Sequence, residues 1–269
     1  MTALREIAPA KLNLALHVRG KLPDGRHSIE TVFAFCTDGD VLTFRRPSHG
    51  DSTVENSGPF GAEIGPGNLI SAAWWAMEQA AGIDSGAEFR LEKNLPVSAG
   101  LGGGSADAAA ALRLITSAFS LDPEIAQRVA PELGSDVPAC LLSLPMRGEG
   151  AGDILTPIDL SDLSGTPVLL VNPRVPLSTA AVFAGWDGVD QGPLVEWREG
   201  RNDLEPSAIA LVPQIGSVLA WLGTQSGAEF VRMSGSGATC FALFESEDAR
   251  DAAADGVPRE WWRLATFLR

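Results

Sequence analysis

Four glycines in the segment 96–106 precede a run of residues that favours a helix. The segment reads Pro-Val-Ser-Ala-Gly-Leu-Gly-Gly-Gly-Ser-Ala, and the alanines and leucines that follow it have high helix propensity. Ser105 is expected to cap this helix, because a serine hydroxyl accepts a backbone N–H one turn on. Upstream, Phe89 and Leu91 alternate with charged residues, which indicates a strand. The order of strand, glycine-rich loop and helix N-terminus predicts an anion site that suits a phosphate chain.

Two familiar phosphate-binding patterns do not fit this segment. A P-loop requires a lysine directly before its serine, and Gly104 occupies that place. A dinucleotide fingerprint that begins at Gly100 and Gly102 requires a third glycine where the chain has Ser105. A tight turn that only caps a structural helix is the alternative, although three consecutive glycines carry an entropy cost that an ordinary turn avoids.

A lysine and an aspartate are candidates for action on a bound substrate. Residues 11–18 alternate, so Lys11 and Asn13 lie on one face of a predicted strand. Asp136 lies in a Gly-Ser-Asp-Val-Pro break before a short apolar helix. Each also has a structural interpretation, Lys11 on a solvated strand face and Asp136 as an acid favoured by the helix dipole.

The elements that would position these residues mix strands and helices without a regular βαβ repeat, which favours an α+β fold in two domains. We place the domains at 1–158 and 159–269. Strands are expected over 11–18, 27–35, 41–45, 89–91, 154–158, 168–171, 229–233 and 261–267, and one more strand is expected to end at residue 244. Helices are expected over 68–81 and 203–222, and other helices are expected to begin at 105, 122, after 136, at 178 and at 247.

Composition excludes several functional classes. A net charge of −14, from 34 acidic and 20 basic residues, disfavours nucleic acid as a partner. No apolar run reaches the roughly 18 residues that span a bilayer, and the first residues lack a signal-peptide core, so no membrane partner is expected. Cys36, Cys140 and Cys240 lack metal-ligand spacing and are expected to be reduced thiols of a cytoplasmic protein. His17 and His49 show no partner pattern and are interpreted as structural.

Seven segments that follow one another between residues 9 and 241 resemble the GHMP kinases. They cover 9–14, 24–27, 67–70, 96–111, 133–138, 201–206 and 233–241. Many members share the glycine loop and the turn at Ser234, whereas the segments at 24–27 and 202–206 point to a member whose small-molecule substrate carries a cytidine diphosphate group. The resemblance implies an N-terminal ATP-binding and catalytic domain and a C-terminal ferredoxin-like α/β sandwich domain.

The same resemblance implies roles for individual residues. The cofactors would be ATP and Mg²⁺, with Asp136 as the base that takes the proton of an alcohol and Lys11 as its partner. Asn13, Arg26, His27 and Phe183 would face the cytidine-bearing substrate. The implied nucleotide-binding residues are Pro96, Val97, Ser98, Ala99, Gly100, Leu101, Gly102, Gly103, Gly104, Ser105 and Ala106.

One position departs from the family pattern. The residue before the family's histidine is commonly a tyrosine that stacks on cytosine, but here it is Arg26, and the chain contains no tyrosine. We expect the planar guanidinium to take over the stacking. Two other functions are consistent with the sequence: another GHMP kinase, of the homoserine or mevalonate type, and a non-catalytic nucleotide-binding regulator on the same fold.

Overall fold

The chain divides into two compact units that alternate along the sequence. The computed structural model describes residues 3–47, 51–65 and 67–269. The first unit comprises Met1–Ala10, Asp38–Val97 and Gly102–Ser143, and the second comprises Lys11–Thr37, Ser98–Leu101 and Leu144–Arg269. The strands β1 (Leu4–Lys21) and β2 (His27–Arg45) contribute residues to both units. The domain boundary after residue 158 stays a prediction.

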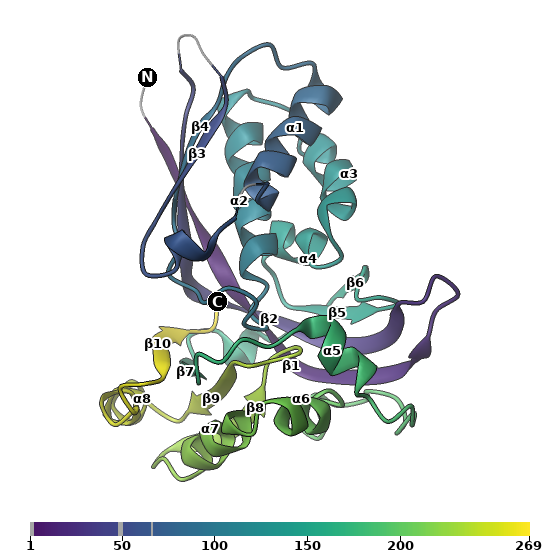
Figure 1. Ribbon diagram of the computed structural model, residues 1–269, viewed down its shortest axis with the longest axis vertical. Coiled ribbons are helices and arrows are strands. Elements are labelled where there is room, and N and C mark those ends of the chain that lie inside the picture. Colours follow the sequence, from purple (N-terminus) through teal and green to yellow (C-terminus); the bar gives the residue numbers. More distant parts are fainter. Residues whose placement is uncertain (1–2, 48–50, 66) are drawn as a thin grey trace. The chain divides into compact units, whose positions relative to one another are not determined.

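Helices dominate the first unit (Figure 1). They are α1 (Leu69–Ala81), α2 (Gly103–Ala118), α3 (Pro123–Leu133), α4 (Val137–Leu142) and the 3-10 turn η1 (Gly61–Glu63). The other α-helices pack against α2, whose run of alanines, 108–111, is fully buried. Small side chains allow helices to approach closely, which explains why an alanine-rich helix occupies this central place.

The helix starts agree with the sequence at α1 and α3 but not at α2. The Asn68 side chain accepts the Ser71 N–H at 3.0 Å, and Gly82 ends α1 in the left-handed conformation, as predicted. The expectation that Ser105 caps α2 is wrong. Gly102 occupies the N-cap position with φ 63°, and the helix begins at Gly103, so the glycines themselves form its start.

The two strands predicted at 27–35 and 41–45 are one continuous strand, β2. The intervening Thr-Asp-Gly-Asp resembles a turn, but its backbone stays extended. A Cβ at Gly39 would lie 1.9 Å from the Ala8 carbonyl oxygen, so the glycine serves a close backbone approach here. In the first unit, Val41–Arg45 pairs antiparallel with β4 (Glu88–Glu92), and β3 (Thr53–Ser57) pairs parallel with β4.

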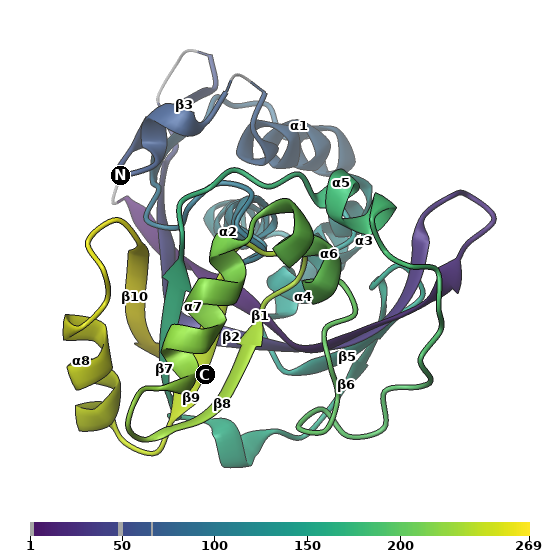
Figure 2. The same ribbon diagram turned by 60° about the horizontal axis from the view of Figure 1, so that its bottom comes forward.

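The second unit contains a four-stranded antiparallel sheet in the order β10-β7-β9-β8. Its strands and helices are β5 (Met146–Glu149), β6 (Ile154–Pro157), β7 (Pro167–Asn172), β8 (Ala228–Met233), β9 (Cys240–Phe244), β10 (Trp262–Phe267), η2 (Ser161–Leu163), α5 (Thr179–Ala184), α6 (Glu205–Leu211), α7 (Gln214–Gly223) and α8 (Glu247–Asp255). Leu169 and Val171 of β7 share one apolar cluster with residues of α7 and α8, so both helices cover the same face (Figure 2). This is the predicted ferredoxin-like sandwich.

The helical region predicted over 203–222 is interrupted. Val212 lies between α6 and α7 with an extended backbone (φ −134°, ψ 85°). Pro213 follows it, and a proline disfavours the helical conformation of the preceding residue. The proline was visible in the sequence and accounts for the break.

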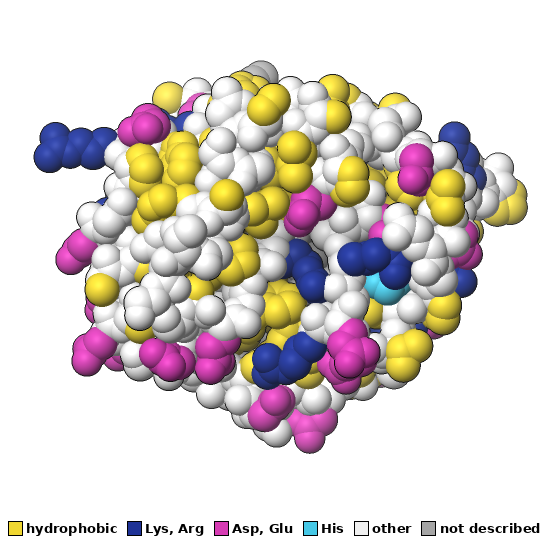
Figure 3. All heavy atoms as spheres, turned by 90° about the horizontal axis from the view of Figure 1, so that it is seen from below, with side chains coloured by type: hydrophobic (Ala, Val, Ile, Leu, Met, Phe, Trp, Pro, Cys, Tyr) yellow, Lys and Arg dark blue, Asp and Glu magenta, His cyan; other side chains and the backbone are white. Residues whose placement is uncertain are grey.

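The described surface mixes both signs of charge. Figure 3 shows Asp and Glu side chains dispersed over one face, with basic side chains singly or in small groups between them. Among the described residues no helix is both long and apolar enough to cross a bilayer.

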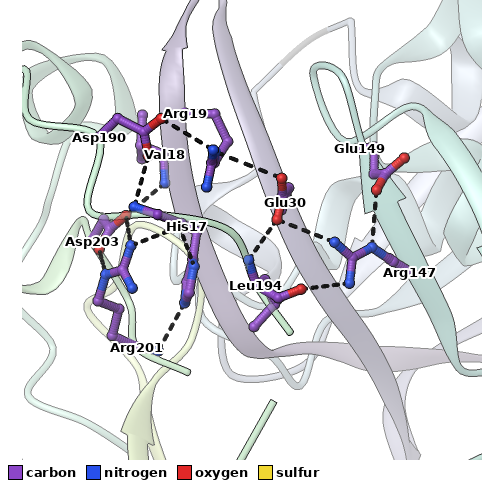
Figure 4. A network of polar contacts seen from close by, with 11 residues as sticks. His17, Val18, Arg19, Glu30, Arg147, Glu149, Asp190, Leu194, Arg201 and Asp203 are labelled. Carbon is purple, nitrogen blue, oxygen red and sulfur yellow. Dashed lines mark hydrogen bonds and ion pairs between the residues drawn. The ribbon is translucent and has the colours of Figure 1, made fainter. Parts of the chain in front are cut away.

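A segment of the second unit between α5 and α6, residues 187–200, has no helix or strand and is held by side chains of the strands (Figure 4). The Glu30 carboxylate of β2 accepts the Leu194 N–H at 2.6 Å, and Arg147 of β5 donates to the Leu194 carbonyl at 2.7 Å. Arg147 also bonds Glu30 at 3.1 Å, and Arg19 pairs with Asp190 at 3.2 Å. We call residues 187–200 the strap.

His17 of β1 links the strap to the segment that follows it. Its Nε2 accepts the Arg201 backbone N–H at 3.2 Å, so Nδ1 carries the proton and donates to the Gly192 carbonyl at 3.1 Å. The side chain is only 2% exposed, and burial is the main cause that lowers the pKa of His17. The neutral imidazole is therefore the form that fits both partners, which agrees with the structural interpretation of this residue.

We predict that His17 makes the stability of the protein depend on pH. The folded pKa lies below the value near 6.5 of an unfolded histidine, so the contribution is present above pH 6.5 and is lost as the pH falls toward the folded pKa. His17→Gln keeps a donor and an acceptor but does not titrate. In thermal unfolding, the advantage of the wild type over His17→Gln should be larger at pH 7.5 than at pH 5.5. An equal advantage at both pH values would contradict this role.

Candidate active site

Residues 98–101 of the glycine-rich loop are attached to the rest of the second unit through backbone contacts. The Lys11 N–H donates to the Leu101 carbonyl at 2.9 Å, and the Thr239 N–H donates to the Ala99 carbonyl at 3.2 Å. Gly100 has φ 75°, and a Cβ there would lie 2.3 Å from the Ser234 carbonyl oxygen. No other residue fits this position, because both the conformation and the space require glycine.

Ser234 and Asn202 fix the turn against which Gly100 packs. The Ser234 hydroxyl donates to the Gly100 carbonyl at 2.9 Å and accepts the Asn13 N–H at 3.2 Å. The buried Asn202 amide donates to the carbonyls of Met233 and Gly235, each at 2.8 Å. The sequence marked both segments as family motifs but gave these two side chains no role; polar residues next to a Gly-Ser-Gly turn were the available signal.

Residues 96–97 and 102–106 belong to the first unit, where the loop becomes helix α2. Gly102, with φ 63°, turns the chain into the helix, and the first helical N–H groups have no partner within the helix. A Cβ at Gly104 would meet only Leu69 at 3.7 Å, so this exposed glycine is not required by packing. The geometry suits the approach of an anion to the first turn.

Lys11 lies in the second unit on β1 and is buried, with 4% exposure. The alternative of a solvated strand face is therefore wrong. Its ammonium donates to Asn13 Oδ1 at 2.8 Å and lies 5.0 Å from the Phe33 ring centroid. Asn13 Nδ2 donates to the Thr31 hydroxyl at 2.8 Å, which in turn donates to the Ala15 carbonyl at 2.6 Å. This relay orients the amide so that its oxygen faces the lysine.

Asp136 lies in the first unit, where it precedes α4 in the break that the sequence predicted. It occupies the N-cap position of α4, but its side chain makes no capping hydrogen bond. A purely capping role therefore does not account for the carboxylate. Its assignment as a base, like the other predicted site roles, stays a prediction.

Three rings of the second unit gather where the substrate-facing residues were predicted. His27, at the start of β2, stacks on Phe183 of α5 with centroids 4.8 Å apart and planes 29° apart. Trp186 meets His27 edge-on at 5.8 Å. Burial lowers the pKa of His27, assisted by the nearby Lys21 charge, so the ring is neutral at pH 7. The sequence identified His27 and Phe183 but missed Trp186, for which the family motif gives no signal.

Arg26 lies beside this cluster in sequence, at the end of the turn between β1 and β2. Its Nε donates to Asp24 at 2.8 Å and its Nη1 to Asp153 at 3.3 Å. The side chain remains 54% exposed. The Arg26 backbone N–H and guanidinium hold the pKa of Asp24 below its usual value. The guanidinium is thus tethered by its polar edge, an arrangement that is compatible with stacking through its plane.

The described residues contain no group of three or more His, Cys, Asp or Glu side chains that could hold a metal ion. The three cysteines are buried, and burial raises the pKa of Cys240 well above its usual value. His49 lies outside the described residues.

Solved structures reproduce the fold. A 4-(cytidine 5'-diphospho)-2C-methyl-D-erythritol kinase superposes with a TM-score of 0.85 at 31% identity, covering 98% of this chain and 99% of that one. A homoserine kinase from Cytophaga hutchinsonii superposes with a TM-score of 0.74 at 16% identity, covering 100% and 95%, and indicates the fold alone.

Sequence comparisons identify the family. Residues 68–143 match the GHMP kinases N terminal domain, and residues 190–264 match the GHMP kinases C terminal domain. A 4-diphosphocytidyl-2-C-methyl-D-erythritol kinase of Novosphingobium aromaticivorans is 49% identical, over 99% of this chain and 93% of its own length. One of Rhizorhabdus wittichii is 48% identical, over 98% and 94%. The chain belongs to the GHMP kinase family.

Proposed function

We propose that this chain transfers the γ-phosphoryl group of MgATP to the 2-hydroxyl of 4-diphosphocytidyl-2-C-methyl-D-erythritol, a step of the non-mevalonate route to isoprenoids. The proposal rests mainly on sequence identity. Two kinases named for this substrate are 49% and 48% identical to this chain over almost its whole length. The His27, Phe183 and Trp186 rings add support, since an aromatic cluster suits a pyrimidine better than homoserine or mevalonate. The buried cysteines suit the cytoplasm as the compartment.

In the proposed reaction the substrate oxygen attacks the γ-phosphorus, the bond to the β–γ bridging oxygen breaks, and ADP leaves. Asp136 accepts the hydroxyl proton. An aspartate is a weak base, but phosphoryl transfer has a loose transition state in which positioning and charge stabilisation supply most of the rate. Lys11, with its ammonium held by Asn13, supplies positive charge to the reaction.

The glycine loop is assigned to the nucleotide phosphates. The N–H groups at the start of α2 and the left-handed Gly102 provide donors without side chains in the way. We treat Mg²⁺ as part of the MgATP substrate, because Mg²⁺ in kinase sites is usually bound through the substrate phosphates and only one or two protein carboxylates.

A direct comparison of acceptors tests the proposal. ADP release should be rapid with the cytidine diphosphate substrate and near background with homoserine and with mevalonate, at equal concentrations. Preference for homoserine or mevalonate would identify a different GHMP kinase. Nucleotide binding without ADP release for any acceptor would favour the non-catalytic regulator.

We predict that Asp136→Asn lowers kcat by roughly 10²–10⁴ while ATP binding is retained, because the amide cannot take the hydroxyl proton. Steady-state kinetics and calorimetry of the variant measure the two quantities. Glu132→Gln, at an exposed position four residues earlier, is the matched control and should behave as wild type. Near-normal turnover of Asp136→Asn would rule out the base.

Arg26 gives a prediction about the pyrimidine. If the guanidinium stacks on cytosine, Arg26→Ala should weaken binding of the cytidine substrate by ~1–3 kcal/mol, the usual value of stacking one base. Arg26→Tyr should restore most of this affinity, and Arg26→Lys should not, because an ammonium has no plane to stack. Calorimetry with the four proteins decides the matter. Rescue by Lys and not by Tyr would mean that Arg26 acts only as a charge.

A further inference from the structure

Three ionisable side chains are buried together in the first unit, next to the start of α2. Lys93, just after β4, is 1% exposed, Asp40 of β2 is fully buried, and Asp107 of α2 is 3% exposed. The Lys93 ammonium lies 2.5 Å from Asp40 Oδ2 and 2.7 Å from Asp107 Oδ2. Burial of charges is costly, so a cluster of this kind requires an explanation beyond packing.

The triad Lys93–Asp40–Asp107 supports the two segments of the loop that belong to the first unit, residues 96–97 and 102–106. Asp40 Oδ1 accepts the N–H groups of Asn94 and Leu95, at 2.6 and 2.8 Å, directly before the loop begins at residue 96. At the other end, a Cβ on Gly103 would lie 2.9 Å from the Lys93 ammonium. The ammonium therefore lies immediately behind the backbone of the first helical residue, with Asp107 one turn further along the same helix.

The charges of the triad do not cancel if both carboxylates are ionised. One lysine faces two aspartates, and Asp107 Oδ1 is a buried atom without a hydrogen-bond partner among the described residues. A proton on Asp107 would make the triad neutral. Burial raises the pKa of Asp107 to about 7, opposed by the Lys93 charge and assisted by the Asp40 charge. The raised pKa makes Asp107 the carboxylate of the triad that can take up a proton.

Another ion pair that links α2 to a neighbouring element, Arg113 with Glu6 of β1 at 2.6 Å, is partly exposed to solvent. The charged groups that act on Asp107 are Lys93 and Asp40. Helix α4 carries no charged residue, and those of α3, which are Glu124, Arg128 and Glu132, are exposed. Glu78 of α1 is only half-buried. A new negative charge at the start of α2 would consequently be felt by Asp107 with little screening.

We propose that Asp107 is a proton-accepting positioning residue of the nucleotide site: the triad supports the glycine loop from behind, and Asp107 takes up a proton when nucleotide phosphates bind to the loop. The inference rests on the assignment of the loop to ATP. The phosphates add negative charge close to the triad, and a proton on Asp107 removes one of the two carboxylate charges that would oppose them. By linkage, nucleotide affinity then rises as the pH falls through neutrality.

The test is calorimetric titration of the whole protein with Mg-ADP at pH 7 in buffers of different ionisation enthalpy. The wild type should take up roughly 0.2–0.5 proton per nucleotide bound. Asp107→Asn keeps an acceptor for Lys93 but cannot titrate, and should lose this uptake. Asp84→Asn removes an exposed carboxylate of the same unit and should leave it unchanged. Between pH 6 and 8.5, Kd of the wild type should rise about three- to tenfold more than that of Asp107→Asn.

The possible outcomes distinguish a failure of the Asp107 proposal from a failure of the proposed kinase function. Tight binding of Mg-ADP with no proton uptake, or equal uptake by wild type and Asp107→Asn, would overturn the role of Asp107 and leave the kinase proposal intact. Failure of the wild type to bind Mg-ADP would instead contradict the assignment of the loop. Should Asp107→Asn unfold, Asp107→Ser provides the non-titrating variant, and the wild-type titration alone still decides whether uptake occurs.

Discussion

The close approach of two backbones at Gly100 is the constraint on which the candidate site depends. A side chain at this position would collide with the Ser234 carbonyl, and the left-handed φ would strain any other residue. Through this contact the loop is attached to the turn that Asn202 holds, and through Leu101 it is attached to Lys11 on β1. Segments that are far apart in the sequence thus converge on a few atoms of main chain, and side chains there serve chiefly to hold carbonyls and amides in place.

Much of this organisation could be predicted from local sequence, because it rests on local chemistry. Asn68 and Asp122 cap their helices as their residue types require, and alternation located β1 and β4. The failures have a common origin in long-range contacts. Gly39 lies between two segments predicted as separate strands, but it belongs to one continuous strand and admits the backbone of Ala8, which no local pattern reveals. Ser105 looked like a cap, but Gly102 turns the chain three residues earlier.

The same distinction applies to the site. The types of Lys11 and Asp136 and the family motifs around them were sufficient to nominate them, yet the burial of Lys11 depends on the elements packed over β1. Trp186 could not be nominated, since only the fold brings its indole to His27. The buried triad shows the limit most clearly. Asp40 lies 53 residues before Lys93, and Lys93 lies 14 residues before Asp107, and nothing in this spacing indicates that they meet.

The strap has a consequence for how this protein can vary. Most of the side chains that hold the strap bind its main-chain atoms. Glu30 and Arg147 bind the amide and carbonyl of residue 194, and His17 binds the carbonyl of Gly192. Arg232 likewise donates to the carbonyls of Trp197 and Gly200. Val195, between the residues whose main chain is bound, is 86% exposed. Sequence drift at such exposed positions should be nearly neutral, unlike drift at the buried Leu194 and Trp197. A change of length by one residue would displace the carbonyls that the surrounding side chains bind, so the strap should tolerate substitution at its exposed positions better than insertion or deletion.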